Sequence, residues 1–313
     1  MPTTLFSFFA LSFLLTFCLT PLTIFFAKKY GLVDDSKSRP HPAHTHHGII
    51  PRAGGIPIFF GIFLSLLFAF PLNKQLVGIL VSAFILVLVG IWDDKKDRSP
   101  YIRFFTNCLA VLVSIAAGVG IPYITHPFGG ILPLDTWRIT FDFFGNHSLI
   151  VWADLFALIW LLWTTNIIGW SGGVDGQLPG FVSISALVIG ILSFRFAATD
   201  PAQLYVSFLA FITAGAFSGF LPWNFYPQKI MPGYGGKTLA GFLLGVLSIL
   251  SFSKLGTAIL VLAVPMTDAL FMLFKRSFSG KSPVRATSEH LHHHLLRLGW
   301  GKRRIAFFYW SIS

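Results

Sequence analysis

Long apolar stretches alternate with short polar segments along most of the chain. Several of these stretches run for roughly 17–22 residues with little or no charge, which is about the length of a helix that crosses a bilayer. The pattern predicts an all-α, polytopic integral membrane protein with about ten transmembrane helices. A tenth helix begins at Arg304 and runs to Ser313, which predicts an incomplete last span. The other spans are expected near residues 5–26, 54–71, 75–92, 104–121, 149–165, 181–197, 203–221, 238–252 and 255–274.

The composition supports a membrane protein and excludes an ordinary soluble one. Apolar residues make up 54% of the 313 residues and charged residues only 11%, and there are 35 phenylalanines. No composition shift or repeat divides the chain, so we predict a single membrane-embedded domain over residues 1–313. In the longest outer loop, residues 122–148, the alternation in ILPLDTWRITFDFF predicts a short β-hairpin.

The basic residues are distributed unevenly between alternate loops. Apart from Lys74, Arg138, Arg195 and Lys254, every Lys and Arg falls in the segments 27–53, 93–103, 166–180, 222–237 and 275–304. The positive-inside rule places these segments in the cytoplasm and the N-terminus outside, as expected for a multi-pass protein of the plasma membrane. The net charge of +11 is therefore one-sided, and topology and anionic lipid headgroups account for it without nucleic acid.

Two adjacent carboxylates, Asp93 and Asp94, stand at the end of the third predicted span in the sequence WDDKKDR. Adjacent carboxylates repel each other unless a positive charge lies beside them. Mg²⁺ is bound by one or two carboxylates together with substrate phosphates, so a divalent ion at this pair is one interpretation. The other interpretation is that Lys95, Lys96 and Arg98 neutralise a solvated turn.

Three glycine-rich segments lie on the same predicted face of the membrane. TTNIIGWSGGVDGQLPG follows the fifth span and carries Asn166 and Asp175. PRAGG and MPGYGGK each precede a helix and carry Arg52 and Lys237 respectively. Glycine lets a backbone approach a ligand closely, and a helix start with a cation suits a phosphate group. A flexible turn and lipid-facing basic anchors are the alternatives.

Four histidines crowd the segment HLHHHLL, namely His290, His292, His293 and His294. A zinc protease motif such as HExxH needs a glutamate between its ligands, and this segment lacks that spacing. The residues alone leave an incomplete zinc site, N–H donors to an anionic ligand, and a solvated helix as alternatives. All of these signals fall in cytoplasmic loops, and they share a preference for phosphate or a divalent ion. That shared preference favours the anionic ligand.

Taken in order, the motifs resemble the polyprenyl-phosphate N-acetylhexosamine-1-phosphate transferases of glycosyltransferase family 4. This superfamily includes phospho-N-acetylmuramoyl-pentapeptide transferase. The similarity runs from about residue 27 to about residue 310. The motifs that carry it are PRAGG, GIWDD, SPYIRFFTN, Asn166 with Asp175-Gly176, GFLPWNFYPQKI, Pro265 to Asp268, and HLHH at 290–293.

The resemblance implies a reaction and a set of site residues. A polyprenyl phosphate attacks the β-phosphorus of a UDP-amino sugar, UMP leaves, and N-acetylglucosamine 1-phosphate is the expected group transferred, for cell-wall or surface-polysaccharide synthesis. Mg²⁺, or Mn²⁺ in its place, bridges the phosphates. By this resemblance Asp93 and Asp94 are catalytic, and they hold the metal together with Asp175. The implied substrate-binding residues are Arg52, Asn166, Asp175, Lys237, His290, His292 and His293.

The chain departs from the family pattern where the family binds metal. Tyr234 stands in place of a metal-binding aspartate and Lys237 in place of a serine, while Gly169 and Gly172 replace an asparagine and an aspartate. A phenol titrates near pH 10 and is a poor Mg²⁺ ligand at neutral pH. Either the three predicted aspartates hold the metal alone, or Lys237 supplies part of the missing charge, or the protein is a non-catalytic relative. Such a relative would bind lipid phosphate or a nucleotide sugar without turnover.

Overall fold

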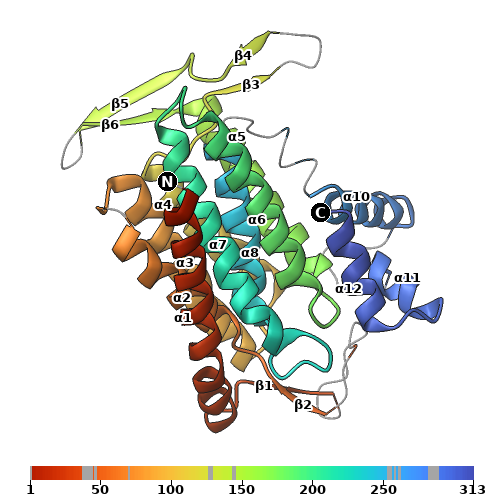
Figure 1. The fold of residues 1–313 in the computed structure, drawn as a ribbon. Helices are drawn as coiled ribbons and strands as arrows, with labels where there is room; N and C mark the ends of the chain where they lie inside the picture. Colours follow the sequence, from red (N-terminus) through yellow and green to blue (C-terminus); the bar gives the residue numbers. More distant parts are fainter. Residues whose placement is uncertain are drawn as a thin grey trace.

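The computed structural model describes residues 2–36, 45, 48–69, 71–125, 130–142, 146–251, 256, 259, 262–280 and 289–313. Most of these residues lie in helices that run side by side in one bundle (Figure 1). The long helices are rich in apolar residues that face outward as well as inward, as expected for a chain surrounded by lipid. The prediction of a helical, polytopic membrane protein is therefore confirmed.

The described helices include 6 that are long and apolar enough to cross a membrane. Two shorter apolar helices, α2 (Gly55–Ala69) and α4 (Pro100–Ala116), lie beside them. The predicted count of about ten complete spans is not confirmed for the described residues, because several predicted spans form helices shorter than a bilayer crossing. The long helices are α1 (Pro2–Lys29), α3 (Lys74–Lys95), α5 (Val151–Ser171), α6 (Gln177–Phe196), α7 (Ala202–Asn224) and α8 (Gly233–Leu250).

Close backbone contacts hold the central helices together. Gly215 and Gly219 of α7 face the carbonyl oxygens of Phe9 and Phe13 in α1, and a Cβ atom at either glycine would clash with the facing backbone. Small residues at such crossings let two backbones approach and gain van der Waals contact, which is the main attraction between helices in lipid. The pairs α1–α7, α6–α7, α5–α8 and α3–α8 form the most extensive helix contacts of the described chain.

The strands lie at the two ends of the bundle (Figure 1). The loop of residues 122–148 forms two hairpins, and the predicted one within ILPLDTWRITFDFF is wrong in its pairing, because the two strands of that segment pair with neighbours outside it and not with each other. Every strand pair in the described residues is antiparallel. At one end β3 (Tyr123–Thr125) pairs with β4 (Ile131–Pro133), and β5 (Arg138–Asp142) pairs with β6 (Asn146–Ile150). At the opposite end β1 (Val33–Asp35) pairs with β2 (Ile49–Pro51).

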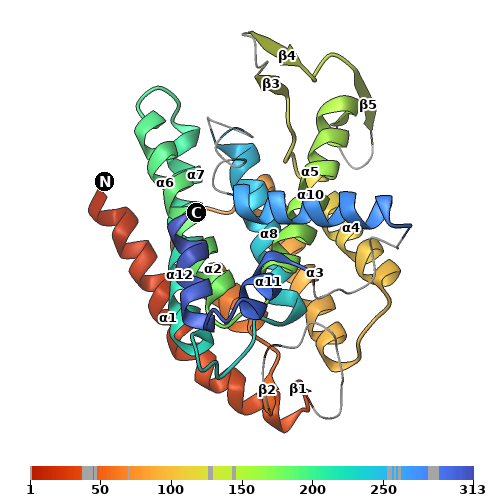
Figure 2. The same ribbon diagram turned by 90° about the vertical axis from the view of Figure 1, so that its right-hand side faces the viewer.

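The ninth span was predicted at residues 255–274. In the structure this region contains helix α10 (Ala263–Phe278), and the first part of the predicted span lies largely outside the described residues. The helix crosses the bundle at a steep angle instead of running along it (Figure 2). It buries Asp268 on one side and exposes Phe274 and Phe278 on the other. A helix with two such different faces is typical of the membrane interface more than of a full crossing.

Two short helices follow α10 in the chain. They are α11 (Leu291–Arg297), which carries most of the histidine cluster, and α12 (Lys302–Ser311). Helix α12 covers the incomplete span predicted from Arg304 and packs against α6. Both helices lie beside the bundle near the end that carries β1 and β2 (Figures 1 and 2), so they close one side of the site.

Candidate active site

A cavity of about 960 Å³ lies at the β1–β2 end of the bundle. Its wall is built by segments far apart in the sequence, from β1 and the ends of α3 and α5 to α8 and α11. Asp94 and Asp175 do not belong to the lining, although both were predicted as site residues. The predicted residues that line the cavity are Arg52, Asp93, Asn166, Lys237, His290, His292 and His293.

The last turn of α3 presents Asp93 to the cavity. Its side chain is fully buried, and Oδ1 accepts hydrogen bonds from Arg103 Nε at 2.6 Å and from the Arg98 backbone N–H at 3.1 Å. The other oxygen, Oδ2, is buried and has no hydrogen-bond partner among the described residues. Because a buried acceptor without a partner costs free energy, this oxygen is suited to a ligand or ion in the cavity.

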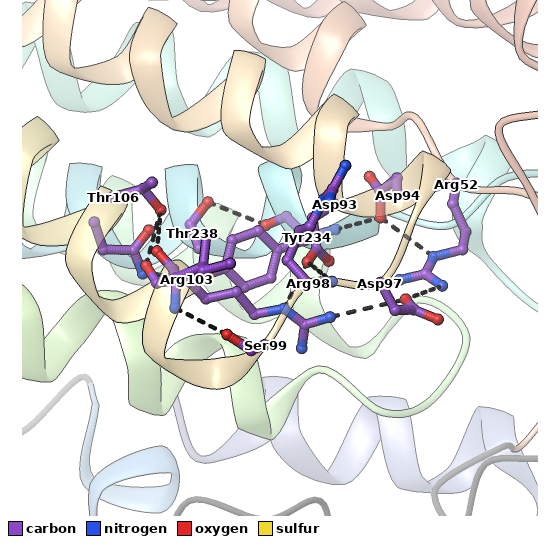
Figure 3. Close-up of polar contacts among 12 residues, drawn as sticks. Arg52, Asp93, Asp94, Asp97, Arg98, Ser99, Arg103, Thr106, Tyr234 and Thr238 are labelled. Atoms are coloured by element: carbon purple, nitrogen blue, oxygen red, sulfur yellow. Dashed lines mark hydrogen bonds and ion pairs between the residues drawn. The ribbon is translucent and has the colours of Figure 1, made fainter.

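Asp94 lies behind the wall and holds three segments together. Its Oδ1 atom is 3.2 Å from Arg52 Nε and accepts the backbone N–H of Tyr234 at 2.9 Å (Figure 3). Gly233 packs directly on the Asp94 carboxylate and has a φ angle of 68°, a conformation that favours glycine. A side chain at Gly233 would displace the carboxylate, so the glycine of MPGYGGK serves this contact.

Arg52 connects the two glycine-rich helix entries. Its guanidinium is 3.8 Å from Asp34, 3.2 Å from Asp94 and 3.4 Å from Asp97. Burial alone would lower the pKa of Arg52, but these carboxylates outweigh it and the pKa is raised. The adjoining backbone pairs with Met231, whose N–H donates to Pro51 O at 2.8 Å. PRAGG and MPGYGGK therefore form one structural unit at the cavity.

The first turn of α8 places Tyr234 and Lys237 on the same side of the helix. The Tyr234 hydroxyl accepts a hydrogen bond from Asn107 Nδ2 at 3.0 Å, and the Arg103 guanidinium lies 5.2 Å from the centre of its ring. Figure 3 shows the ring beside the Arg103 side chain, which itself reaches Asp93. Lys237 lines the cavity, and its amine makes no hydrogen bond or ion pair with any residue that the structure describes.

Asp175 organises a loop and does not join the aspartate pair. Its Oδ1 accepts a hydrogen bond from Lys302 Nζ at 2.9 Å, and its Oδ2 accepts the backbone N–H of Gln228 at 3.2 Å. No three His, Cys, Asp or Glu side chains among the described residues form a group that could hold a metal ion. The predicted metal set of Asp93, Asp94 and Asp175 is therefore not brought together, because Asp175 faces α12.

Asn166 lines the cavity, as predicted, although the amide nitrogen of its side chain already donates a hydrogen bond within α5. Nδ2 donates to the carbonyl oxygen of Leu162 at 2.7 Å, one helical turn earlier in α5. The amide oxygen accepts no hydrogen bond from the residues that the structure describes, so it can serve a ligand in the cavity. Gly169 and Gly172 also line the cavity, so the two replaced family positions add no polar side chain to its wall.

The histidines divide into three roles. His290 Nδ1 lies 2.8 Å from Asp268 Oδ2, and Asp268 Oδ1 accepts the backbone N–H of Leu291 at 2.8 Å, which fixes the start of α11. His292 and His293 are buried, with ring centres 4.3 Å apart, and His292 Nδ1 and His293 Nε2 have no partner within the described part of the chain. His294 faces outward and lies 3.1 Å from Arg297.

Burial keeps the two inner histidines neutral. It lowers the pKa of His293 to about 4, and the adjacent His290 acts in the same direction. Burial, followed by the neighbouring His293, lowers the pKa of His292 well below its usual value. A neutral imidazole offers one N–H donor and one acceptor. The site therefore presents hydrogen-bonding imidazoles at neutral pH, and the cations of its wall are Arg52, Arg103 and Lys237.

Several site residues had no role in the sequence interpretation. Arg103 and Asn107 belong to SPYIRFFTN, and Asp268 belongs to the Pro265 to Asp268 motif, so resemblance marked their positions without assigning contacts. Lys302 and Asp97 carried no signal beyond charge. Their partners lie in other segments, such as Asp175 for Lys302, and a single sequence does not show those pairings.

Comparison with known proteins gives consistent matches over this region. A family model described as glycosyl transferase family 4 matches residues 76–252. A probable undecaprenyl-phosphate N-acetylglucosaminyl 1-phosphate transferase of Bacillus subtilis (strain 168) is 28% identical over 303 residues, covering 94% of this chain and 78% of the relative. An undecaprenyl-phosphate alpha-N-acetylglucosaminyl 1-phosphate transferase of Haemophilus influenzae is 31% identical over 284 residues, covering 88% and 74%.

A third relative carries a polyprenyl lipid that is shorter by one prenyl unit in its name. It is a decaprenyl-phosphate N-acetylglucosaminephosphotransferase of Mycolicibacterium smegmatis, 26% identical over 294 residues, which cover 85% of this chain and 70% of the relative. The three relatives share the amino sugar and a polyprenyl phosphate in their names, and two of them name the same prenyl chain. The matched family residues include α3, with the aspartate pair, and the first turn of α8.

Proposed function

Because the chain belongs to glycosyl transferase family 4, we propose that it transfers N-acetylglucosamine 1-phosphate from a UDP-sugar to a polyprenyl phosphate and releases UMP. The names of the relatives support the amino sugar and the lipid. The observation that carries the proposal is the composition of the cavity wall. Three cations, Arg52, Arg103 and Lys237, and the imidazoles of His292 and His293 line the same cavity as Asp93. Charged and N–H donors grouped in this way bind phosphates strongly.

In this reaction an oxygen of the lipid phosphate attacks the β-phosphorus of the donor. The bond from that phosphorus to the bridging oxygen breaks, and UMP leaves with the oxygen and its electron pair. Both reactants are anions, so catalysis depends on positioning them and on neutralising their charge. Arg52 and Lys237 supply positive charge, while His292 and His293 donate hydrogen bonds to phosphate or sugar oxygens. Asn166 offers its amide oxygen to the donor.

The predicted Mg²⁺, or Mn²⁺ in its place, fits the wall at one atom. Asp93 lines the cavity, and although its Oδ1 pairs with Arg103, its Oδ2 is buried and unpartnered in the described chain. Asp94 and Asp175 lie outside the lining and form ion pairs with Arg52 and Lys302. One carboxylate together with substrate phosphates is an ordinary ligand set for Mg²⁺. We therefore assign the metal contact to Asp93 alone. When bound, the ion would neutralise charge on the transferring phosphoryl group.

The orientation of the protein completes the proposal. The chain is a multi-pass membrane protein. The cavity lies at the end of the bundle that carries the basic segments around Arg52 and Arg103. By the positive-inside rule this end faces the cytoplasm, where UDP-sugars are found, and the N-terminus faces outward. The lipid acceptor reaches the cavity from the bilayer.

A product assay tests the proposed function. Protein in membranes receives undecaprenyl phosphate and a panel of labelled UDP-sugars, and we expect UMP release and label in the lipid with UDP-N-acetylglucosamine. Asp93→Asn should lower turnover by roughly two orders of magnitude or more, since a metal–phosphate contact is worth several kcal/mol. Asp135→Asn removes the same charge from an exposed residue of the outer loop and should leave turnover unchanged.

Two outcomes would contradict the proposal in different ways. Turnover that survives Asp93→Asn and Asp94→Asn together would show that the aspartate pair has no part in the reaction. Saturable binding of the UDP-sugar without any lipid product from the wild-type chain would instead identify a non-catalytic relative. The replacement of the family aspartate by Tyr234 makes this second outcome a specific alternative.

A further inference from the structure

Lys237 is the cation of the cavity wall whose charge is not matched by a carboxylate. Arg52 forms ion pairs with Asp34, Asp94 and Asp97, and Arg103 forms ion pairs with Asp93 and Asp97. The Lys237 amine has no such partner among the residues that the structure describes, although its side chain is mostly buried and lines the cavity. A charged group held in that way costs free energy unless an anionic ligand joins it.

The surroundings of Lys237 favour an anion over a second cation. Tyr234, one helical turn before it, contributes a phenol that is uncharged at neutral pH and is fixed by Asn107. The Asp94 carboxylate, which attracts the Lys237 amine, is already shared by Arg52 and the Tyr234 backbone N–H. The first turn of α8 therefore offers one ammonium and no unpaired carboxylate, which is the reverse of a divalent metal site.

The glycines beside Lys237 have a packing role of their own, so they are not evidence against an anion site at Lys237. A Cβ atom on Gly235 would press on Gly90 of α3, and one on Gly55 of α2 would meet the backbone of Gly235 and Gly236. Helices α2, α3 and α8 thus cross with their backbones in contact. This crossing fixes the start of α8 and with it the direction of the Lys237 side chain.

We infer that Lys237 binds the diphosphate of the donor directly, so that donor binding by this chain does not require a divalent cation. The inference rests on the proposed function and concerns its first step, binding, separately from transfer. A diphosphate needs positive charge close to its oxygens, and Mg²⁺ commonly supplies that charge in phosphoryl-transfer sites. Here the protein supplies it through a covalently attached ammonium in the cavity wall. Any metal held at Asp93 then affects transfer more than donor affinity.

Equilibrium binding of UDP-N-acetylglucosamine to the full chain in detergent tests the inference. Titration calorimetry, or quenching of Trp163 and Trp170 in the cavity wall, gives the Kd in EDTA and in Mg²⁺. For the wild type we expect the two values to agree within about threefold. Lys237→Met should weaken binding in EDTA on the order of 10- to 100-fold, since it removes a charge-assisted hydrogen bond. Lys237→Arg, which keeps the charge, should restore most of the affinity.

The control is Lys229→Met, which removes the same charge from an exposed residue that lies 5.1 Å over the Trp223 ring and outside the cavity wall. It should bind the donor like the wild type. The double change Tyr234→Asp with Lys237→Ser installs both family residues, and we expect its donor binding to become dependent on Mg²⁺. Circular dichroism and size-exclusion profiles show whether each variant is folded, so loss of binding is read only from folded protein.

Each contrary result has a separate meaning. Wild-type binding that appears only with Mg²⁺, in a protein that makes lipid product, would overturn the inference and leave the proposed function intact. Equal affinities for Lys237→Met and Lys229→Met would also overturn it, because the ammonium would then not touch the donor. Absence of donor binding in both buffers, together with absence of lipid product, would overturn the proposed function and this inference with it.

Discussion

At the scale of single residues, the site keeps its imidazoles neutral. His292 and His293 pack ring against ring in α11, away from water, and Asp268 is committed to His290 and the backbone of Leu291. Protonation of either inner ring would place a charge in this buried pair without a counter-ion beside it. The pair therefore keeps its neutral, hydrogen-bonding form at neutral pH and becomes protonated only in acid.

We predict that acid destabilises the folded protein through these rings. The unfolded chain binds a proton at each histidine below about pH 6.5, whereas burial keeps the pKa of folded His293 at about 4. The contribution of His293 to stability is therefore complete above about pH 6.5 and is lost as the pH falls toward 4. Unfolding temperatures measured across this range should fall less steeply for His293→Gln than for the wild type. Parallel curves would show that His293 is not buried as described.

The sequence predicted some of the site residues but not the contacts that they make. Tyr234 and Lys237 were identified as departures because both stand inside a recognisable motif. Their contacts were not predictable, since Asn107 and Arg103 approach Tyr234 from a helix more than a hundred positions away in the chain. Asp175 was assigned to a metal by resemblance, but its pairing with Lys302 depends on where α12 lies, and no local pattern encodes that.

At the scale of elements, hydrophobic length predicted most helices well. The span expected at 75–92 is α3 (Lys74–Lys95), and the span expected at 203–221 is α7 (Ala202–Asn224). The exception is α10, because length alone does not separate a crossing helix from one that lies across the bundle. That distinction depends on which face of α10 meets α5, which is a tertiary contact.

The contact between α1 and α7 gives a prediction at this scale. Gly219→Ala places a Cβ atom against the Phe13 carbonyl oxygen and should cost about 1–3 kcal/mol through overpacking. We expect a fall of several degrees in the unfolding temperature measured in detergent. Gly301→Ala is the matched control, since its added Cβ atom meets nothing within 4 Å and its φ is −70°. Equal unfolding temperatures for both variants would contradict the close crossing.

At the scale of the whole molecule, the two ends of the bundle differ in chemistry. One end carries the paired charges and the cavity, and the other carries the β3–β4 and β5–β6 hairpins (Figure 1). The proposed orientation predicts the side of the membrane on which each end reacts. With Cys18 and Cys108 replaced by Ala, Ser148→Cys should react with an impermeant maleimide in intact cells. Ser36→Cys should react only after permeabilisation, and the reverse pattern would place the cavity outside.

The ion pair between Asp175 and Lys302 also has a consequence for biosynthesis. The two residues are 127 positions apart, and α11, with its histidines, lies just before Lys302. A ribosome therefore delivers nearly every helix to the membrane before it makes the residues that complete the cavity. A chain halted at α8 already contains Arg52, Asp93 and Lys237 but lacks the segments that enclose them. An unfinished chain of that length therefore has no enclosed pocket, and the site is completed only when the last segments have been synthesised.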